Sequence, residues 1–185
     1  MGRLPPHQKL RTDFPVLHFG GVPEFDRDTW DFRVEGVVEN PISLNYDEFL
    51  ALKRTEDVSD FHCVTGWSKF DLKWEGVRFI DLAGLVKPKK NGRFAIIVAE
   101  GEYTTSLPLD ELMDPDVLLA YKFEGKPLEP VHGGPLRLVV PKKYAYKSAK
   151  WVRKVVFTEE DEPGFWERRG YSNSADPWKE ERYSH

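Results

Sequence analysis

Apolar and polar residues alternate along several short stretches of the chain, a period that predicts half-buried β-strands. The clearest example is FRVEGVV at residues 32–38, and residues 150–157 alternate in the same way. Residues 58–64 form another apolar stretch, which stops at the turn-forming pair Thr65 and Gly66. The apolar run within residues 93–99 is typical of a buried strand. We therefore expect a chain dominated by strands.

Helical signals are fewer and shorter. Asn45 is a favourable helix N-cap, and Glu48 three residues later completes a capping box. Residues 79–86 have the pattern of a second short helix, and Pro108 opens a helical turn that extends to Met113. These helices do not alternate regularly with strands, as βαβ units would.

The second half of the chain adds a predicted hairpin. Glu124 and Gly125 form a turn after the strand-like residues 117–123, and residues 135–141 predict a further strand. No repeat and no linker is evident, so the predicted fold class is α+β: a mixed, strand-rich single domain. Residues 1–25, rich in Pro and Gly, are expected to form an arm packed on the core, and residues 26–185 to form the domain itself.

Composition excludes several classes of protein. At 185 residues the chain can bury one sizeable core, and a net charge of −4 does not indicate binding to nucleic acid or to an anionic membrane. No apolar run approaches the roughly 20 residues of a membrane span. The first residues lack the apolar core of a secretory signal, and a single cysteine excludes an internal disulfide. We expect a cytoplasmic protein without a membrane span.

Positive charge is concentrated in one part of the sequence. Residues 130–158 contain no Asp or Glu, and they carry seven cations: Arg137, Lys142, Lys143, Lys147, Lys150, Arg153 and Lys154. Unpaired like charges repel one another unless an anion is bound, so this basic block predicts an anion site. Arg137 could bind a phosphate through two parallel hydrogen bonds, and Lys150 could act as a point charge. The backbone at Gly133 and Gly134 could approach such a ligand closely.

Two other interpretations of the basic block remain open. It could be a solvated basic face, part of it the outer side of the strand at residues 150–157. It could also bind nucleic acid, since Tyr144, Tyr146 and Trp151 could stack on bases. The absence of a nucleic-acid motif and the negative net charge argue against that function.

The only cysteine, Cys63, precedes the Thr65–Gly66 turn. A lone cysteine is most often an inert buried residue. His62 is its neighbour, but adjacent residues on a strand point to opposite faces, so His62 is a poor base for it. The histidines lack the paired spacing of a zinc site. A metal held mainly by another set of ligands needs only one thiolate, which is compatible with this sequence.

Taken together, several segments resemble the sulfite oxidase-type family of molybdopterin-dependent oxidoreductases. They are residues 15–26, the cysteine segment 61–86, residues 102–157 with the His-Gly-x-Pro-x-Arg motif, and residues 164–178. The resemblance covers roughly residues 14–180, and the ordered combination of motifs is specific. In extent the chain is closer to the bacterial stand-alone catalytic subunits than to sulfite oxidases, which carry a haem domain and a dimerisation domain.

The resemblance implies a cofactor and a set of site residues. The cofactor is Mo-molybdopterin, molybdenum with one pyranopterin dithiolene, and Cys63 is its metal ligand. The pterin and its phosphate are held by His18, His132, Arg137, Ser148, Ala149 and Lys150. Tyr171 lies beside the metal, where it could orient or protonate a substrate oxygen.

Two departures from the family pattern bear on function. Ala145 stands where relatives commonly have Gly, so the cofactor approach could differ there. Residues 15–26 lack the arginine that sulfite oxidases use for sulfite, which weakens sulfite as the substrate.

The reaction implied is two-electron oxygen-atom transfer on a small substrate such as a sulfur or nitrogen oxide. No haem or iron–sulfur motif is present, so a separate electron-transfer partner is expected. The alternatives are a catalytically inactive binding module that retains the fold, and a nucleic-acid-binding protein.

Overall fold

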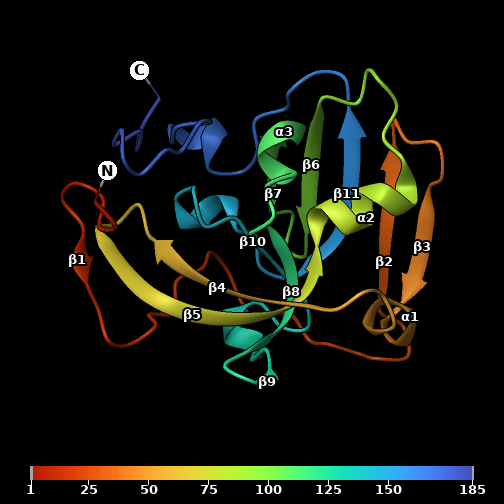
Figure 1. Cartoon of the computed structure of the whole chain (residues 1–185), viewed down its shortest axis with the longest axis horizontal. Helices are drawn as coiled ribbons and strands as arrows, with labels where there is room; N and C mark the ends of the chain where they lie inside the picture. The colour runs from red at the N-terminus through yellow and green to blue at the C-terminus, as the bar shows by residue number, and fades with distance from the viewer. Residues whose placement is uncertain (1, 185) are drawn as a thin grey trace.

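Two β-sheets organise the chain (Figure 1). The computed structural model describes residues 2–184. The first residue of the expected arm, residue 1, and the last residue of the expected domain, residue 185, lie outside this range. In the five-stranded sheet the order is β3-β2-β11-β6-β7. The bounds of these strands are Ile42–Asn45, Asp31–Gly36, Val152–Thr158, Phe94–Ala99 and Thr104–Pro108. Strands β2 and β11 are parallel, and the other neighbours are antiparallel.

The second sheet has six strands and carries the cysteine segment at one end. Its path is β1-β5-β8-β10, with β4 paired to β5 and β9 paired to β8. The bounds are Lys9–Leu10 for β1, Thr55–His62 for β4, Trp67–Arg78 for β5, Leu118–Phe123 for β8, Lys126–Pro127 for β9 and Arg137–Val139 for β10. Because β4 ends at His62 and β5 begins at Trp67, Cys63 lies in the tight turn between two long antiparallel strands.

The helices are short, as the sequence predicts. They are α1 (Tyr46–Leu50), α2 (Phe79–Val86) and α3 (Leu109–Leu112), with 3-10 turns η1 (Pro130–His132), η2 (Ala145–Lys147) and η3 (Glu167–Arg169). The capping box of α1 is confirmed: Asn45 Oδ1 accepts from Glu48 N at 2.9 Å, and Asn45 N donates to Glu48 Oε2 at 2.8 Å. The strand-rich α+β class is therefore confirmed. Among residues 2–184, no helix is long and apolar enough to span a bilayer.

The six-stranded sheet separates two hydrophobic cores. Along β8, side chains alternate between its faces, so Leu119 and Tyr121 enter the larger core and Leu118 and Ala120 the smaller one. The larger core packs the five-stranded sheet against the helices and the inner face of the second sheet. The smaller core contains Cys63. The cysteine therefore lies at the edge of a packed aromatic and aliphatic layer, which limits how far its turn can move.

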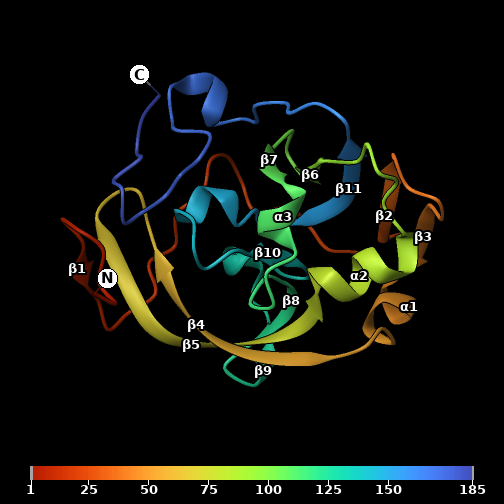
Figure 2. The same cartoon turned by 45° about the horizontal axis from the view of Figure 1, so that its top comes forward.

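The two ends of the described chain lie beside the cysteine turn. Strand β1 pairs with the start of β5, with Lys9 opposite Trp67. The segment that follows η3 runs next to the segment around β1 (Figures 1 and 2), where Trp178 Nε1 donates to the carbonyl of Gly2 at 3.0 Å. Segments from both ends of the sequence therefore surround the site described next.

Candidate active site

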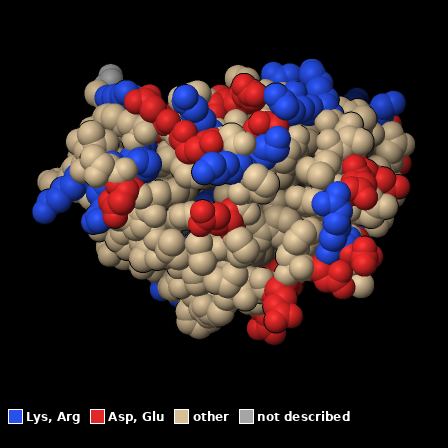
Figure 3. Space-filling model, turned by 90° about the horizontal axis from the view of Figure 1, so that it is seen from below, with Lys and Arg blue, Asp and Glu red and all other residues tan. Residues whose placement is uncertain are grey.

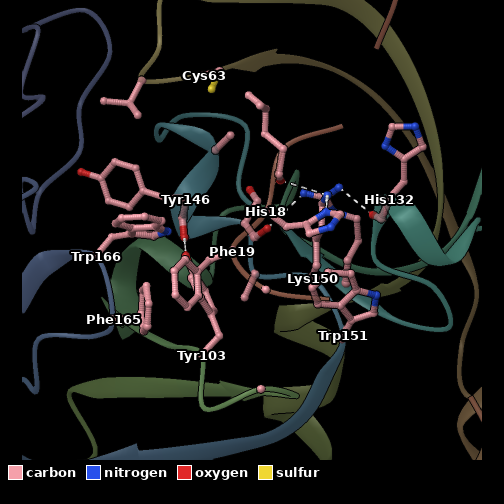
Figure 4. A pocket seen from close by; sticks show the side chains of 18 of the residues that line it. His18, Phe19, Cys63, Tyr103, His132, Tyr146, Lys150, Trp151, Phe165 and Trp166 are labelled. Atoms are coloured by element: carbon pink, nitrogen blue, oxygen red, sulfur yellow. Dashed lines mark hydrogen bonds between the residues drawn. The ribbon is translucent and has the colours of Figure 1, made fainter. Parts of the chain in front are cut away.

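A cavity of about 420 Å³ lies at the open side of the cysteine turn. Its walls come from five parts of the chain: residues 14–23, 61–67, 100–103, 132–151 and 165–171. All eight site residues expected from the sequence line it, namely His18, Cys63, His132, Arg137, Ser148, Ala149, Lys150 and Tyr171. Figure 4 shows His18, His132 and Lys150, together with Trp151, on one side of the cavity, Tyr103, Tyr146, Phe165 and Trp166 on the other, and Cys63 at the top. We call these sides the basic end and the aromatic end.

Lys150 lies at the centre of the basic end. Its Nζ donates to the carbonyls of Val131 at 2.7 Å and Leu17 at 3.1 Å, and it lies 3.4 Å from His18 Nδ1. Burial, with a smaller effect from the positive charge of Arg137, lowers the pKa of Lys150 to about 7. A partly buried ammonium with carbonyl partners and a lowered pKa is a group that gains free energy when an anion binds.

Arg137 lies behind the basic end and holds two of its backbone segments. Its side chain is buried, and Nη1 and Nη2 donate to the carbonyls of His132 at 2.8 Å and Ser148 at 3.0 Å. The guanidinium also lies 5.2 Å from the ring centroid of Phe61. Desolvation lowers the pKa of Arg137 to about 9, which leaves it charged at neutral pH. Arg137 therefore braces two pocket segments and adds positive charge.

His132 and Ser148 complete the basic end, one held by ring stacking and the other by a backbone hydrogen bond. His132 stacks on Phe14 with ring centroids 4.4 Å apart, and its Nδ1 is buried without a partner among the described residues. Burial, with the charges of Lys150 and Arg137, lowers the pKa of His132. The hydroxyl of Ser148 accepts from Val140 N at 2.9 Å, so that side chain is already engaged. Burial also lowers the pKa of His18, so His18 and His132 are both neutral. Their rings therefore offer nitrogen lone pairs and N–H groups to a ligand.

Cys63 faces the cavity from the turn between β4 and β5. Its Sγ lies 3.1 Å from Thr65 Oγ1, and its N donates to Trp67 O at 2.8 Å. Burial raises the pKa of the Cys63 thiol, which a bound metal would reverse by coordinating the thiolate. His62 points elsewhere, to Ser68 Oγ at 2.8 Å and to the ring of Trp178. The expectation that His62 is not positioned as a base for Cys63 agrees with this geometry.

The aromatic end has a wall of rings packed in tilted and T-shaped pairs, and it carries Tyr171. Its ring centroid lies 5.4 Å from those of both Tyr146 and Trp166. Tyr146 OH donates to Ser172 O, and Tyr103 OH donates to Tyr146 O, so neither phenol is free. Burial raises the pKa of both Tyr103 and Tyr146. These phenols therefore stay protonated, so the side chains that line this end of the pocket are neutral.

The basic block is largely neutralised by carboxylates from other parts of the chain. Lys142, Lys143, Lys147, Arg153 and Lys154 pair with Asp114, Glu111, Glu167, Asp31 and Glu35, respectively. Within residues 2–184, Arg137 and Lys150 have no carboxylate partner. The expectation of an unpaired cluster therefore holds for these two cations only, and both line the cavity. On the face in Figure 3, blue and red side chains lie next to one another and form no continuous basic surface.

Several lining residues were not assigned from the sequence. The rings of Phe19, Tyr103, Phe165 and Trp166 form most of the aromatic end. The family resemblance includes residues 164–178, but it implies a role for Tyr171 alone. The local signal was the density of aromatic residues in that motif, and the partners of these rings are too distant in sequence to be inferred from it.

The chain matches a family model described as the oxidoreductase molybdopterin binding domain over residues 19–166. It is 47% identical to the "uncharacterized oxidoreductase YuiH" of Bacillus subtilis, covering 99% of this chain and 93% of that protein. It is 31% identical to the protein-methionine-sulfoxide reductase catalytic subunit MsrP of Campylobacter jejuni, over 77% of this chain and 54% of that protein. The crystal structure of the sulfane dehydrogenase SoxCD from Paracoccus pantotrophus superposes with a TM-score of 0.70. It shares 22% identity over 81% of this chain and 42% of that chain, which shows the fold alone.

The protein therefore belongs to the family of molybdopterin-binding oxidoreductases of the sulfite oxidase type. It is an enzyme of that family, and the cofactor of the family is Mo-molybdopterin.

Proposed function

We propose that the cavity holds Mo-molybdopterin, with Cys63 as the metal ligand, and that the enzyme catalyses two-electron oxygen-atom transfer on a small uncharged oxide. One observation carries the proposal. Cys63, the only cysteine, lines the same cavity as Arg137 and Lys150, the two cations of the basic block that have no carboxylate partner within residues 2–184, although Cys63 is far from both in sequence.

The chemistry of the lining residues fits this cofactor. Lys150 and Arg137 satisfy their donors with carbonyl oxygens, so their positive charges are uncompensated until an anion binds. His132 Nδ1 is buried and has no partner among the described residues. A Cβ at Gly133 would lie 3.0 Å from side-chain atoms of both Arg137 and Lys150, so a glycine is needed where these two residues converge. This cradle suits the phosphate and the polar ring edge of the pterin.

The residues of the site have separate roles in this proposal. Lys150 and Arg137 offset the phosphate charge, and His18, His132, Ser148 and Ala149 border the pterin. When bound, the cofactor supplies the two-electron redox chemistry at the molybdenum. Tyr171 offers an O–H group that can hydrogen-bond the substrate oxygen as charge develops on it. The rings of the aromatic end exclude water from that oxygen.

The neutral aromatic end supports an uncharged substrate. Besides Arg137 and Lys150, the charged lining residue is Glu100, which is paired with Arg153 at 2.6 Å. An oxyanion such as sulfite would lose its hydration without gaining a cation among the side chains that line the aromatic end. A sulfoxide or N-oxide presents one oxygen and apolar substituents, which match a hydroxyl and a wall of rings. The name of the C. jejuni relative, a methionine-sulfoxide reductase, agrees with this class.

Three further expectations are part of the proposal. Electrons are exchanged with a separate partner, and cytoplasmic residence stays a prediction. Residues 1–25 act as an arm on the domain of residues 26–185, which is supported by the arm residues that line the cavity.

The experiment is a metal and substrate analysis. The full chain, expressed with ample molybdate, is expected to retain molybdenum and pterin in equal amounts and to reduce sulfoxides or N-oxides with an artificial electron donor. Cys63→Ser is the matched control, because it keeps the shape of the side chain and removes the thiolate. We expect it to stay folded and to lose turnover. An active serine variant would remove Cys63 from the reaction.

The same analysis decides between the alternatives. A folded chain that binds the cofactor but acts on no oxide or sulfite would be a binding module. Salt-sensitive retention on DNA or RNA without molybdenum would support nucleic-acid binding. The argument for nucleic-acid binding depends on the basic block. It is weakened because carboxylates pair with most of the cations of that block.

A further inference from the structure

Two residues outside the matched family region hold the backbone of the cysteine turn. Within the turn, Gly66 N donates to Cys63 O at 3.0 Å. Cys63 N donates to Trp67 O at 2.8 Å. The carbonyls of residues 63 and 64 each accept a hydrogen bond from a distant side chain. The donors are Gln8 and Arg182.

Gln8 approaches the turn from the segment that leads into β1. Its Nε2 donates to Cys63 O at 3.0 Å, and the side chain is buried. The next residue, Lys9, donates from its backbone N to Gly66 O at 2.9 Å. Gln8 therefore contacts the turn from a position that the pairing of the next residue, Lys9, with the turn holds in place.

Arg182 approaches from the opposite side. Its Nη1 donates to Val64 O, and the guanidinium lies 5.0 Å from the ring centroid of Tyr144. Arg182 is placed by the backbone, because Ser172 N donates to Arg182 O at 3.0 Å. The same pairing brings Tyr171 next to Tyr183, so this segment joins the turn to the wall that carries Tyr171.

We infer that Gln8 and Arg182 are positioning residues for Cys63: they fix the carbonyls of residues 63 and 64, and with them the direction of the thiol into the cavity. The inference rests on the proposed role of Cys63 as the metal ligand. A turn of four residues has few internal hydrogen bonds, so external donors decide how often it opens. Both residues lie outside residues 19–166, the range that the family model covers.

The first test uses the cofactor-free full chain, where Cys63 is the only thiol. The probe is an aromatic disulfide reagent, and the readout is its rate of reaction with Cys63 in native buffer. Gln8→Met and Arg182→Met keep the bulk of each side chain and remove the donors. We expect each to speed labelling about tenfold, the factor for the loss of one buried hydrogen bond that holds the closed turn. Arg182→Lys retains a donor and is expected to restore most of the protection.

The matched control is His7→Ala. His7 adjoins Gln8 and contacts Glu180, so the substitution removes a contact between the same two segments without touching the turn. We expect its labelling rate to equal that of the wild type. Equal rates in all variants, or the same acceleration in His7→Ala, would overturn the inference. Should Arg182→Met fail to fold, Gln8→Met and Arg182→Lys decide the question.

The second test uses the molybdenum-loaded enzyme. Because the thiolate is a ligand in this proposal, Gln8→Met and Arg182→Met should shift the visible absorption that arises from sulfur-to-metal charge transfer, whereas His7→Ala should not. An unchanged spectrum in both Met variants would contradict the positioning role. If the chain retains no molybdenum, the proposed function fails, and the labelling rates still decide whether Gln8 and Arg182 hold the turn.

Discussion

Lys147 and Glu167 form an ion pair in the interior, with Nζ and Oε1 2.6 Å apart and side chains only 1% and 2% exposed. Lys147 lies between two residues of the cavity wall, Tyr146 and Ser148, and its Nζ also donates to Ser106 O at 2.8 Å. Glu167 opens η3, on the segment that carries Tyr171, and accepts from Thr105 at 2.6 Å. This pair therefore ties the two sides of the aromatic end together.

Removing one partner of this pair should be costly. Lys147→Met leaves the Glu167 carboxylate buried and unpaired, and we expect the free energy of unfolding to fall by about 3–5 kcal/mol, measured by urea denaturation. Lys142→Met, which breaks an exposed pair with Asp114, should change it by less than about 1 kcal/mol. The double variant Lys147→Met with Glu167→Leu should recover part of the loss. A loss in the double variant equal to the sum of the single losses would show that the pair is not coupled.

Gly133 should be intolerant of a side chain for two separable reasons. Its φ of 107° is in the left-handed region, and an added Cβ would lie 3.0 Å from atoms of Arg137 and Lys150. Gly125 has a φ of 78° and no atom within 4 Å of an added Cβ, so Gly125→Ala measures the backbone cost alone, about 1 kcal/mol. We expect Gly133→Ala to cost more in thermal unfolding and also to lower molybdenum content. Equal effects of the two substitutions would mean that the side chains of Arg137 and Lys150 move away from the added Cβ without a cost in stability.

Lys150 should make the stability of the cofactor-free chain depend on pH. Burial first, and Arg137 second, lower its pKa from the ordinary 10.5 to about 7. Between these two pH values the folded chain therefore binds fewer protons than the unfolded chain. The free-energy cost of holding protonated Lys150 in the folded chain is complete below pH 7 and disappears as the pH rises towards 10.5. Relative to Lys150→Met, the wild type should gain stability between pH 7 and 9 in urea unfolding. Parallel pH profiles of the two proteins would contradict this.

Tyr171 should affect turnover more than cofactor binding. Tyr171→Phe removes one O–H donor from the cavity, and we expect kcat to fall by about 10²–10³, with molybdenum content unchanged. Tyr183→Phe is the control, because Tyr183 packs against Tyr171 and is mostly exposed. It should retain wild-type kcat. Full activity in Tyr171→Phe would assign the substrate oxygen to another donor.

Elements specified by local signals could be predicted from the sequence. The capping box of α1, helix α2 at Phe79–Val86, and the turn at Glu124 and Gly125 all depend on residues a few positions apart. The sequence does not predict the twelve-residue strand β5, because this strand bends across both cores and its register with β4 and β8 shifts at two places. Its burial pattern therefore lacks a simple period of two.

For the site, the sequence predicted eight of the lining residues, but neither their partners nor most rings of the aromatic end. The residues that the family resemblance marked, Cys63 and Lys150 among them, line one cavity. The carboxylates that neutralise most of the basic block could not be foreseen, because Glu35 and Glu111 are brought to it only by the sheet and helix packing. For the same reason the contact of Arg182 with Val64 has no local signal in the sequence.

The walls of the cavity are drawn from segments scattered between residues 14 and 171. A chamber assembled from such distant parts closes only after the long-range strand pairings have formed, which is late in folding. Capture of the pterin complex therefore requires a chain that has already reached its native topology, and no short excised peptide would retain it.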